Sequence, residues 1–166
     1  MLETSRLILR HFMPDDAAFI MELLNEPGWK RFIGDRNINA QDDARKYIEK
    51  LRVSYRDHGF GLCAVQLKVD ETLIGMCGLI KRETLEDADI GFALLSRFEG
   101  NGYAREAAKA TLEYAHVDLG LPRVVAITTE DNERSARLLE GIGLRYEETI
   151  SMRGDPEMLR LYGISF

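Results

Sequence analysis

Two glycines one residue apart, Gly100 and Gly102, separate an apolar run from an alanine-rich segment that begins at Tyr103. A helix beginning there would leave about four backbone N–H groups without partners, and its first turn would carry a partial positive charge. An anion would satisfy both, and glycine lets it approach the backbone closely. The pattern therefore predicts a phosphate site on the backbone of residues 100–104. A tight turn without a ligand is the alternative.

The residues around the glycines do not fit the two commonest phosphate motifs. A P-loop needs Lys and then Ser or Thr after its last glycine, whereas Tyr103 and Ala104 stand there. A dinucleotide fingerprint needs glycine or alanine where Arg105 stands, and it follows the first strand of a parallel sheet. A pyrophosphate bound without a metal, as in coenzyme A, fits the loop, and we expect no metal site.

The elements that position this loop follow from the spacing of apolar residues. Strands are predicted at 5–12, 61–69, 73–81, 88–95, 123–130, 145–153 and 157–165. Helices are predicted from Pro14 to the Pro27-Gly28 pair, from a cap at Asn39 to Arg56, from 103 to 119, and from 132 to 142. With no repeat or linker between them, we expect one α+β domain over residues 1–166.

Three motifs resemble the GNAT superfamily of acetyl-CoA-dependent N-acetyltransferases. The segment from Arg97 to Gly102 resembles its Q/R-x-x-G-x-G/A loop. The start from Thr4 to Arg10 resembles the T-x-R-L-x-L-R opening of the Rim-type branch (ribosomal-protein N-terminal acetyltransferase-like), and residues 132–144 are similar to its N-x-x-S … G-F segment. The resemblance covers essentially the whole chain. It implies a mixed, mostly antiparallel seven-stranded sheet flanked by about four helices, with splayed central strands.

The resemblance also implies where acetyl-CoA would bind. Strands 88–95 and 123–130 would part as a V, and a bulge near Phe92 would aim an N–H group at the thioester carbonyl. Pantetheine would add as a strand against the backbone of Phe92, Ala93, Leu94 and Leu95. Pyrophosphate would lie on Gly100, Asn101, Gly102, Tyr103 and Ala104, and the pantetheine arm would contact Asn132 and Ser135. The alternatives are a core aromatic at Phe92, a helix cap at Asn132 and a solvent-facing residue at Ser135.

Acetyl transfer to an amine needs a base for the amine and a proton for the departing thiolate. The tyrosine that supplies this proton in many members of the superfamily is replaced by Leu139, so Ser135 is the local candidate. Glu83 and Asp89 flank the entrance to the strand at 88–95 and are candidate bases, with solvated loop charges as the alternative. Trp29 is expected to line the acceptor site or to anchor the core.

Composition limits the partners. The 166 residues are 45% hydrophobic and 30% charged, as in ordinary globular proteins. A net charge of −6 argues against nucleic acid and suits a basic partner. Cys63 and Cys77 are expected as small core residues, and without a membrane-length apolar run or signal peptide we expect a cytoplasmic protein with no membrane partner.

These observations give the expected function. The acceptor would be an amine-bearing peptide or small molecule, attacked directly without a covalent enzyme intermediate, and the enzyme would be a monomer or homodimer. Because Leu139 replaces the tyrosine, a non-catalytic acyl-CoA-binding module is the alternative. A phosphate binder that does not use coenzyme A is a third.

Overall fold

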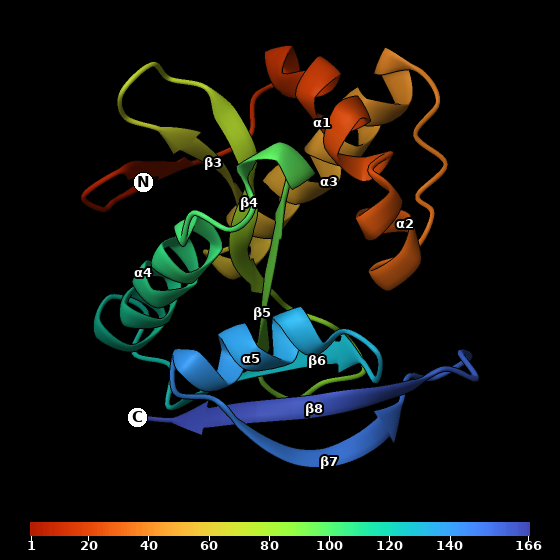
Figure 1. Ribbon diagram of the computed structural model, residues 1–166, viewed down its shortest axis with the longest axis vertical. Coiled ribbons are helices and arrows are strands. Elements are labelled where there is room, and N and C mark those ends of the chain that lie inside the picture. Colours follow the sequence, from red (N-terminus) through yellow and green to blue (C-terminus); the bar gives the residue numbers. More distant parts are fainter.

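The computed structural model describes residues 1–166, and one eight-stranded sheet runs through it (Figure 1). In spatial order the strands are β1 (Leu2–Glu3), β2 (Leu7–Arg10), β3 (Leu62–Leu67), β4 (Leu73–Ile80), β5 (Ala88–Leu94), β6 (Arg123–Thr129), β8 (Met158–Ser165) and β7 (Arg145–Ser151). All neighbours are antiparallel except β5 and β6, which are parallel. The expected mixed, mostly antiparallel sheet is confirmed, but it has eight strands rather than seven.

The additional strand is β1, which pairs with β2 in a short hairpin. The segment predicted as one strand over 5–12 begins with the hairpin turn. Here the Thr4 N–H donates to the Leu7 carbonyl at 2.9 Å, and the Leu7 N–H donates to Thr4 Oγ1 at 2.9 Å. A two-residue strand shows no alternation of apolar and polar residues, so the sequence pattern could not reveal it.

Five α-helices accompany the sheet, one more than the four predicted: α1 (Ala17–Leu24), α2 (Pro27–Phe32), α3 (Gln41–His58), α4 (Tyr103–Val117) and α5 (Glu133–Gly141). Pro27 does not end a helix but opens α2, because the missing N–H of a proline costs nothing in a first turn. The predicted cap at Asn39 is also wrong. Ala40 is the N-cap of α3, and the Asp43 carboxylate accepts hydrogen bonds from the N–H groups of Asn39 and Ala40.

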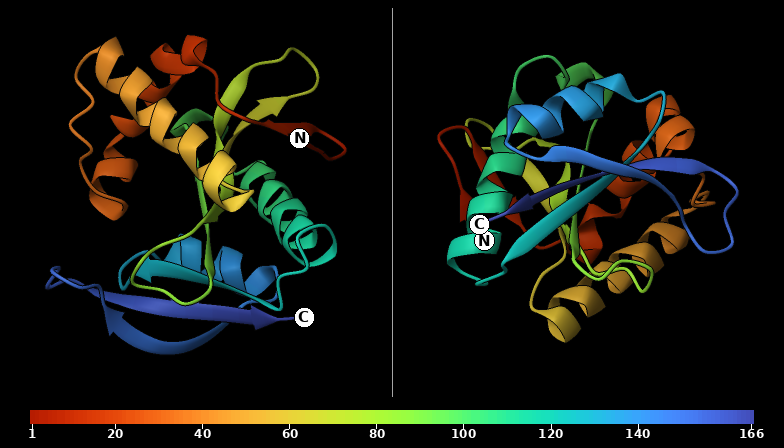
Figure 2. Two further views of the ribbon diagram at one scale, coloured as in Figure 1. Left: turned by 180° about the vertical axis from the view of Figure 1, so that it is seen from behind. Right: turned by 90° about the horizontal axis from the view of Figure 1, so that it is seen from below.

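Helices cover both faces of the sheet. On one face, α4 and α5 bury small and aliphatic side chains, among them Ala108 and Leu139, against the strands. On the other face, α1, α2 and α3 pack on β3 and β4, with Ile48 of α3 in the same cluster as Met76 of β4. Figure 2 shows from behind how α3 lies across the molecule, away from α5. None of the helices is both long and apolar enough to cross a membrane.

The two halves of the sheet part between β5 and β6. These strands pair only at their first residues, Ala88 with Val124 and Asp89 with Val125. Beyond this vertex they diverge, and β6 and β8 run across the direction of β4 and β5 (Figure 1). The splayed central strands expected from the sequence are present. Beyond Asp89, the edge of β5 that faces β6 is therefore without a partner strand.

Candidate active site

A cavity of about 1250 Å³ occupies the gap between the splayed strands and continues between α2 and α3. On one side of β5 it is lined by the start of α4 and by α5, and on the other by α2 and α3 (Figure 1). A pocket for one small ligand usually measures about 300–1,000 Å³. The cavity is therefore larger than a usual pocket for one small ligand.

The free edge of β5 offers backbone groups from alternate residues only. The Leu95 N–H donates to the Ile74 carbonyl at 2.9 Å, and the Leu95 carbonyl accepts from Phe98. Because strand hydrogen bonds alternate in direction, Ala93 also faces β4. The groups of Phe92 and Leu94 then face the gap.

The predicted bulge near Phe92 is wrong. The β4–β5 register is unbroken from Gly75↔Leu94 to Ile80↔Asp89, and the nearest irregularity lies in β3, between Val65 and Gln66. The Phe92 N–H therefore turns toward the gap because of the ordinary alternation of an antiparallel strand, with no distortion needed.

The glycine loop ends in a set of free backbone donors. Gly100 and Gly102 both have a φ of 79°, in the left-handed region that a side chain disfavours. The first hydrogen bond of α4 is donated by the Glu106 N–H to the Gly102 carbonyl at 3.0 Å. The six N–H groups of residues 100–105 have no acceptor in the protein. They lie where the helix dipole adds positive potential, so the loop can bind an anion such as a phosphate.

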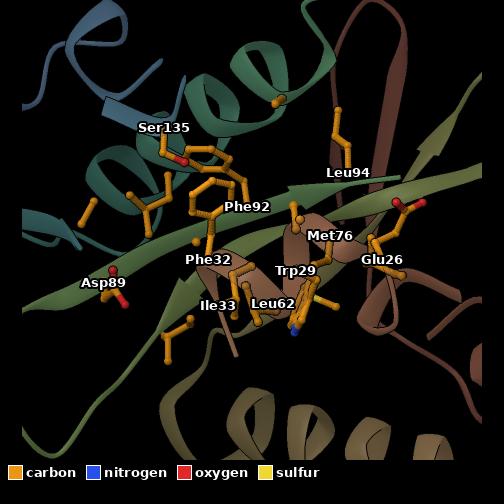
Figure 3. A pocket seen from close by; sticks show the side chains of 18 of the residues that line it. Glu26, Trp29, Phe32, Ile33, Leu62, Met76, Asp89, Phe92, Leu94 and Ser135 are labelled. Atoms are coloured by element: carbon orange, nitrogen blue, oxygen red, sulfur yellow. The ribbon is translucent and has the colours of Figure 1, made fainter. Parts of the chain in front are cut away.

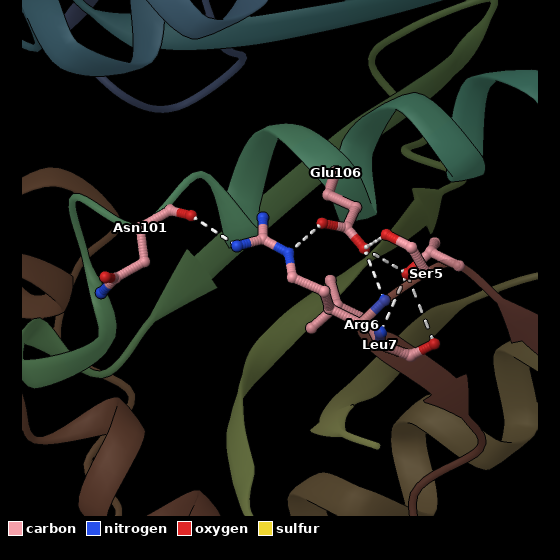
Figure 4. Close-up of polar contacts among 6 residues, drawn as sticks. Ser5, Arg6, Leu7, Asn101 and Glu106 are labelled. Carbon is pink, nitrogen blue, oxygen red and sulfur yellow. Dashed lines mark hydrogen bonds and ion pairs between the residues drawn. The ribbon is translucent and has the colours of Figure 1, made fainter. Parts of the chain in front are cut away.

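The chain start holds this loop in place (Figure 4). The Glu106 carboxylate accepts hydrogen bonds from Thr4 Oγ1 at 2.5 Å, Ser5 Oγ at 3.2 Å and the Arg6 N–H at 3.0 Å. It also forms an ion pair with Arg6 Nε at 2.7 Å, while Arg6 NH1 donates to the Asn101 carbonyl at 3.0 Å. We call Thr4, Ser5, Arg6 and Glu106 the N-terminal clamp. The T-x-R-L motif thus acts on the glycine loop from about a hundred residues away.

Helix α5 brings two predicted residues to the opposite side of the gap. The Asn132 side chain caps the helix by accepting a hydrogen bond from the Ser135 N–H at 3.2 Å, which confirms its capping role. Both residues line the cavity, and Figure 3 shows Ser135 above β5 on the same side as Phe92. The Ser135 hydroxyl has no hydrogen-bond partner in the protein and is free to act on a ligand.

Asp89 lies at the vertex where β5 and β6 part, and it lines the cavity. It is 2% exposed, so its interpretation as a solvated loop charge is wrong. Its carboxylate is 2.5 Å from Arg82 Nε. Burial raises the pKa of Asp89 to about 6, against the lowering effects of Arg82 and of the Ile127 N–H. Asp89 is therefore ionised near neutral pH but closer to proton exchange than an ordinary aspartate.

Other sequence candidates lie differently. Glu83 is exposed and, like Leu95 and Asn101, does not line the cavity. The Asn101 side chain donates back to the carbonyls of Phe98 and Glu99, so it shapes the loop. Trp29 does line the cavity; it is 6% exposed, and its indole N–H has no acceptor.

Sequence reasoning missed two cavity-lining arginines, Arg105 and Arg134, next to the loop and to Asn132. Arg105 donates to the Gly141 carbonyl at 2.9 Å, and Arg134 pairs with Glu99 at 2.6 Å. The available signal was their place in the sequence: Arg105 directly follows the glycine loop, and Arg134 stands between Asn132 and Ser135. Leu139, where the proton-donating tyrosine would stand, is buried in the cavity wall.

Comparison with known proteins gives one consistent result. The profile of the acetyltransferase (GNAT) domain matches residues 6–145. A Bacillus subtilis relative named "Uncharacterized N-acetyltransferase YoaA" is 28% identical, with 98% of this chain and 95% of the relative covered. The crystal structure of an Agrobacterium tumefaciens acetyltransferase superposes with a TM-score of 0.84 at 26% identity, covering 99% of this chain and 94% of that one. A Vibrio fischeri ribosomal-protein-S5-alanine acetyltransferase shares the fold, with a TM-score of 0.81 at 20% identity and coverage of 98% and 94%.

Proposed function

Because this chain belongs to the GNAT family of acetyl-CoA-dependent acetyltransferases, we propose that it transfers the acetyl group to a primary amine by direct attack within its cavity. The observation that carries this proposal is the juxtaposition of six unpartnered N–H groups at the start of α4 with the free edge of β5. The N–H groups at the start of α4 suit a pyrophosphate, and the free edge of β5 suits an extended arm that contains amides. Coenzyme A contains both, in that order.

The residues that would hold acetyl-CoA follow from these groups. The N–H groups of Gly100, Gly102, Tyr103 and Ala104 would bind the pyrophosphate, with Arg105 and Arg134 at its sides. The backbone of Phe92 and Leu94 would pair with the pantetheine arm, together with the Asn132 side chain. The four backbone partners first expected at residues 92–95 are thus reduced to two.

Three groups would carry the chemistry once bound acetyl-CoA supplies its activated acetyl group. The Phe92 N–H would donate a hydrogen bond to the carbonyl oxygen that gains negative charge. Asp89 would accept a proton from the amine, through water where needed; an α-amine, with a pKa of about 7.7–8.0, is partly neutral already. Ser135 would give a proton to the sulfur, the role that Leu139 cannot fill. Glu83 is not proposed, because it lies outside the cavity.

The acceptor would enter between α2 and α3. In Figure 3, Trp29 and Ile33 of this region lie below β5, on the opposite side from Ser135. The amine would then reach the strand edge from the side opposite the glycine loop. Trp29 would form the apolar floor under the amine-bearing carbon chain.

The test is a coupled measurement of thiol release and product mass. The protein would be incubated with acetyl-CoA and a panel of peptides with free N-termini, lysine ε-amines and small amines. We expect amine-dependent release of coenzyme A and an acetylated product. Tight acetyl-CoA binding with no product from any amine would overturn the proposal in favour of a non-catalytic acyl-CoA-binding module.

A further inference from the structure

The acceptor half of the cavity carries charge of the opposite sign to the whole protein. Its lining includes five cationic side chains, Arg36, Lys46, Lys50, Lys81 and Arg82, which we call the cationic wall. Three carboxylates, Glu26, Asp43 and Asp89, line the same half. The net charge of the chain is −6, so this concentration of cations does not follow from composition.

None of these carboxylates forms an ion pair with Arg36, Lys46, Lys50 or Lys81. Glu26 accepts from the N–H and the hydroxyl of Ser96 at 3.4 Å and forms no ion pair. Asp89 is paired with Arg82 at 2.5 Å. The Asp43 carboxylate accepts hydrogen bonds from the N–H groups of Asn39 and Ala40 at the start of α3.

The remaining cations have no acidic partner. Arg36, Lys46 and Lys50 form no ion pair. Lys81 donates only to main-chain carbonyls, those of Leu85 and Glu86. Four positive charges therefore face the cavity uncompensated.

The wall comes from three separate segments of the chain, and the phenol of Tyr47 lines the same cavity. Lys46 and Lys50 are one turn apart on α3 and lie on one face of the helix. Tyr47 stands three residues before Lys50 on the same helix. Burial raises the pKa of Tyr47, and the positive charges of Arg36 and Arg82 oppose that rise. The Tyr47 hydroxyl makes no hydrogen bond within the protein. Cations and a free hydroxyl are the groups that recognise a carboxylate or phosphate.

We propose that the amine acceptor is anionic, with a carboxylate or phosphate close to its reacting amine, and that the cationic wall selects it. This rests on the proposed acetyl transfer and adds the class of acceptor. The net charge of the chain alone had favoured a basic partner. At the site the cationic wall favours an anionic partner instead, because a cleft lined by one sign of charge concentrates ligands of the opposite charge. A peptide with acidic residues after its N-terminus and a free α-amino acid both offer this chemistry.

Matched acceptors test the proposal and distinguish the two sources. Three hexapeptides would share an N-terminal alanine and carry acidic, neutral or basic residues behind it; alanine would be compared with alaninamide. We expect kcat/KM for the acidic peptide to exceed that for the basic one by about tenfold or more, and the ratio to shrink as salt screens the wall. A preference for alanine over alaninamide alone would assign the wall to small amino acids.

A charge-reversal pair gives the control. Lys50→Glu changes the wall, whereas Lys109→Glu makes the same change at an exposed position of α4 outside the cavity. We expect only Lys50→Glu to reduce the acidic-to-basic ratio, by about fivefold or more. Equal or better use of neutral and basic acceptors, or equal effects of the two substitutions, would overturn the anionic class and leave acetyl transfer standing. No acetylated product from any acceptor would instead count against the proposed function.

Discussion

Replacing Glu106 by Gln tests whether the chain start positions the cofactor loop. The substitution keeps the size of the side chain but removes the charge that accepts from Thr4, Ser5 and Arg6. The new amide also places an N–H donor where Arg6 already donates. The N-terminal clamp should loosen, and the glycine loop with it, because Arg6 also holds the Asn101 carbonyl.

The magnitude follows from the exposure of the pair. The Arg6 side chain is 45% exposed and that of Glu106 18%, so the ion pair itself contributes at most about 1 kcal/mol. Adding the weakened hydrogen bonds gives a loss of about 1–2 kcal/mol in the free energy of unfolding. For a chain of this length each kcal/mol lowers Tm by about 2–4 °C. If the same energy is lost from loop positioning, the KM for acetyl-CoA should rise about fivefold to thirtyfold while kcat changes little.

The control is Glu113→Gln, the same substitution at an exposed position two turns later on α4. Thermal unfolding and steady-state kinetics with varied acetyl-CoA would be measured for both variants. Equal stability of the two variants would refute the energetic reasoning. A fall in stability without a rise in the KM for acetyl-CoA would refute the positioning role, and leave the clamp as a structural contact only.

Three further predictions concern the chemistry. With its pKa raised to about 6, Asp89 should lose its basic form as the pH falls, so kcat/KM should decline below about pH 6. Asp89→Asn should remove most activity and abolish that decline. The same decline of kcat/KM at low pH in the variant would exclude Asp89 as the base. The same raised pKa means that folded Asp89 holds its proton more tightly than the unfolded chain does. As the pH rises from about 4 to 6, the free energy of unfolding should therefore fall relative to that of Asp89→Asn, as measured by urea unfolding across that range. Ser135→Ala should lower kcat by about 10²-fold or more with acetyl-CoA binding retained, and undiminished turnover would remove Ser135 as the proton donor.

Local patterns carried much of the prediction. The alanine-rich helix that begins at Tyr103, the cap at Asn132 and the two glycines are each defined by neighbours along the chain, and the structure has them where the sequence indicated. The splayed strands came from the resemblance rather than from any residue pattern. Local rules failed where one residue has two uses: Pro27 reads as a helix stop but serves as a helix start.

The remaining features depend on contacts between distant segments. Asp89 is a single carboxylate in an apolar strand, and only its pairing with Arg82 and its place at the strand vertex explain its burial. The sequence predicts Ser5 and Arg6 only as strand residues. Their contacts with Glu106 could not be predicted, because Glu106 is far away in the sequence. The cationic wall is assembled from α3 and two loops, so no spacing along the chain could indicate it.

The central claim is that the glycine loop and the edge of β5 bind acetyl-CoA, and calorimetric titration tests it most directly. The unmodified protein would be compared with Gly102→Glu, which places a negative side chain at a left-handed position of the loop. We predict saturable binding by the unmodified protein, a matching stabilisation of about 2.7 kcal/mol at a ligand concentration about 100 times Kd, and loss of binding in a variant that still unfolds cooperatively. No binding by the unmodified protein, or equal binding by both, would contradict the assignment of this loop.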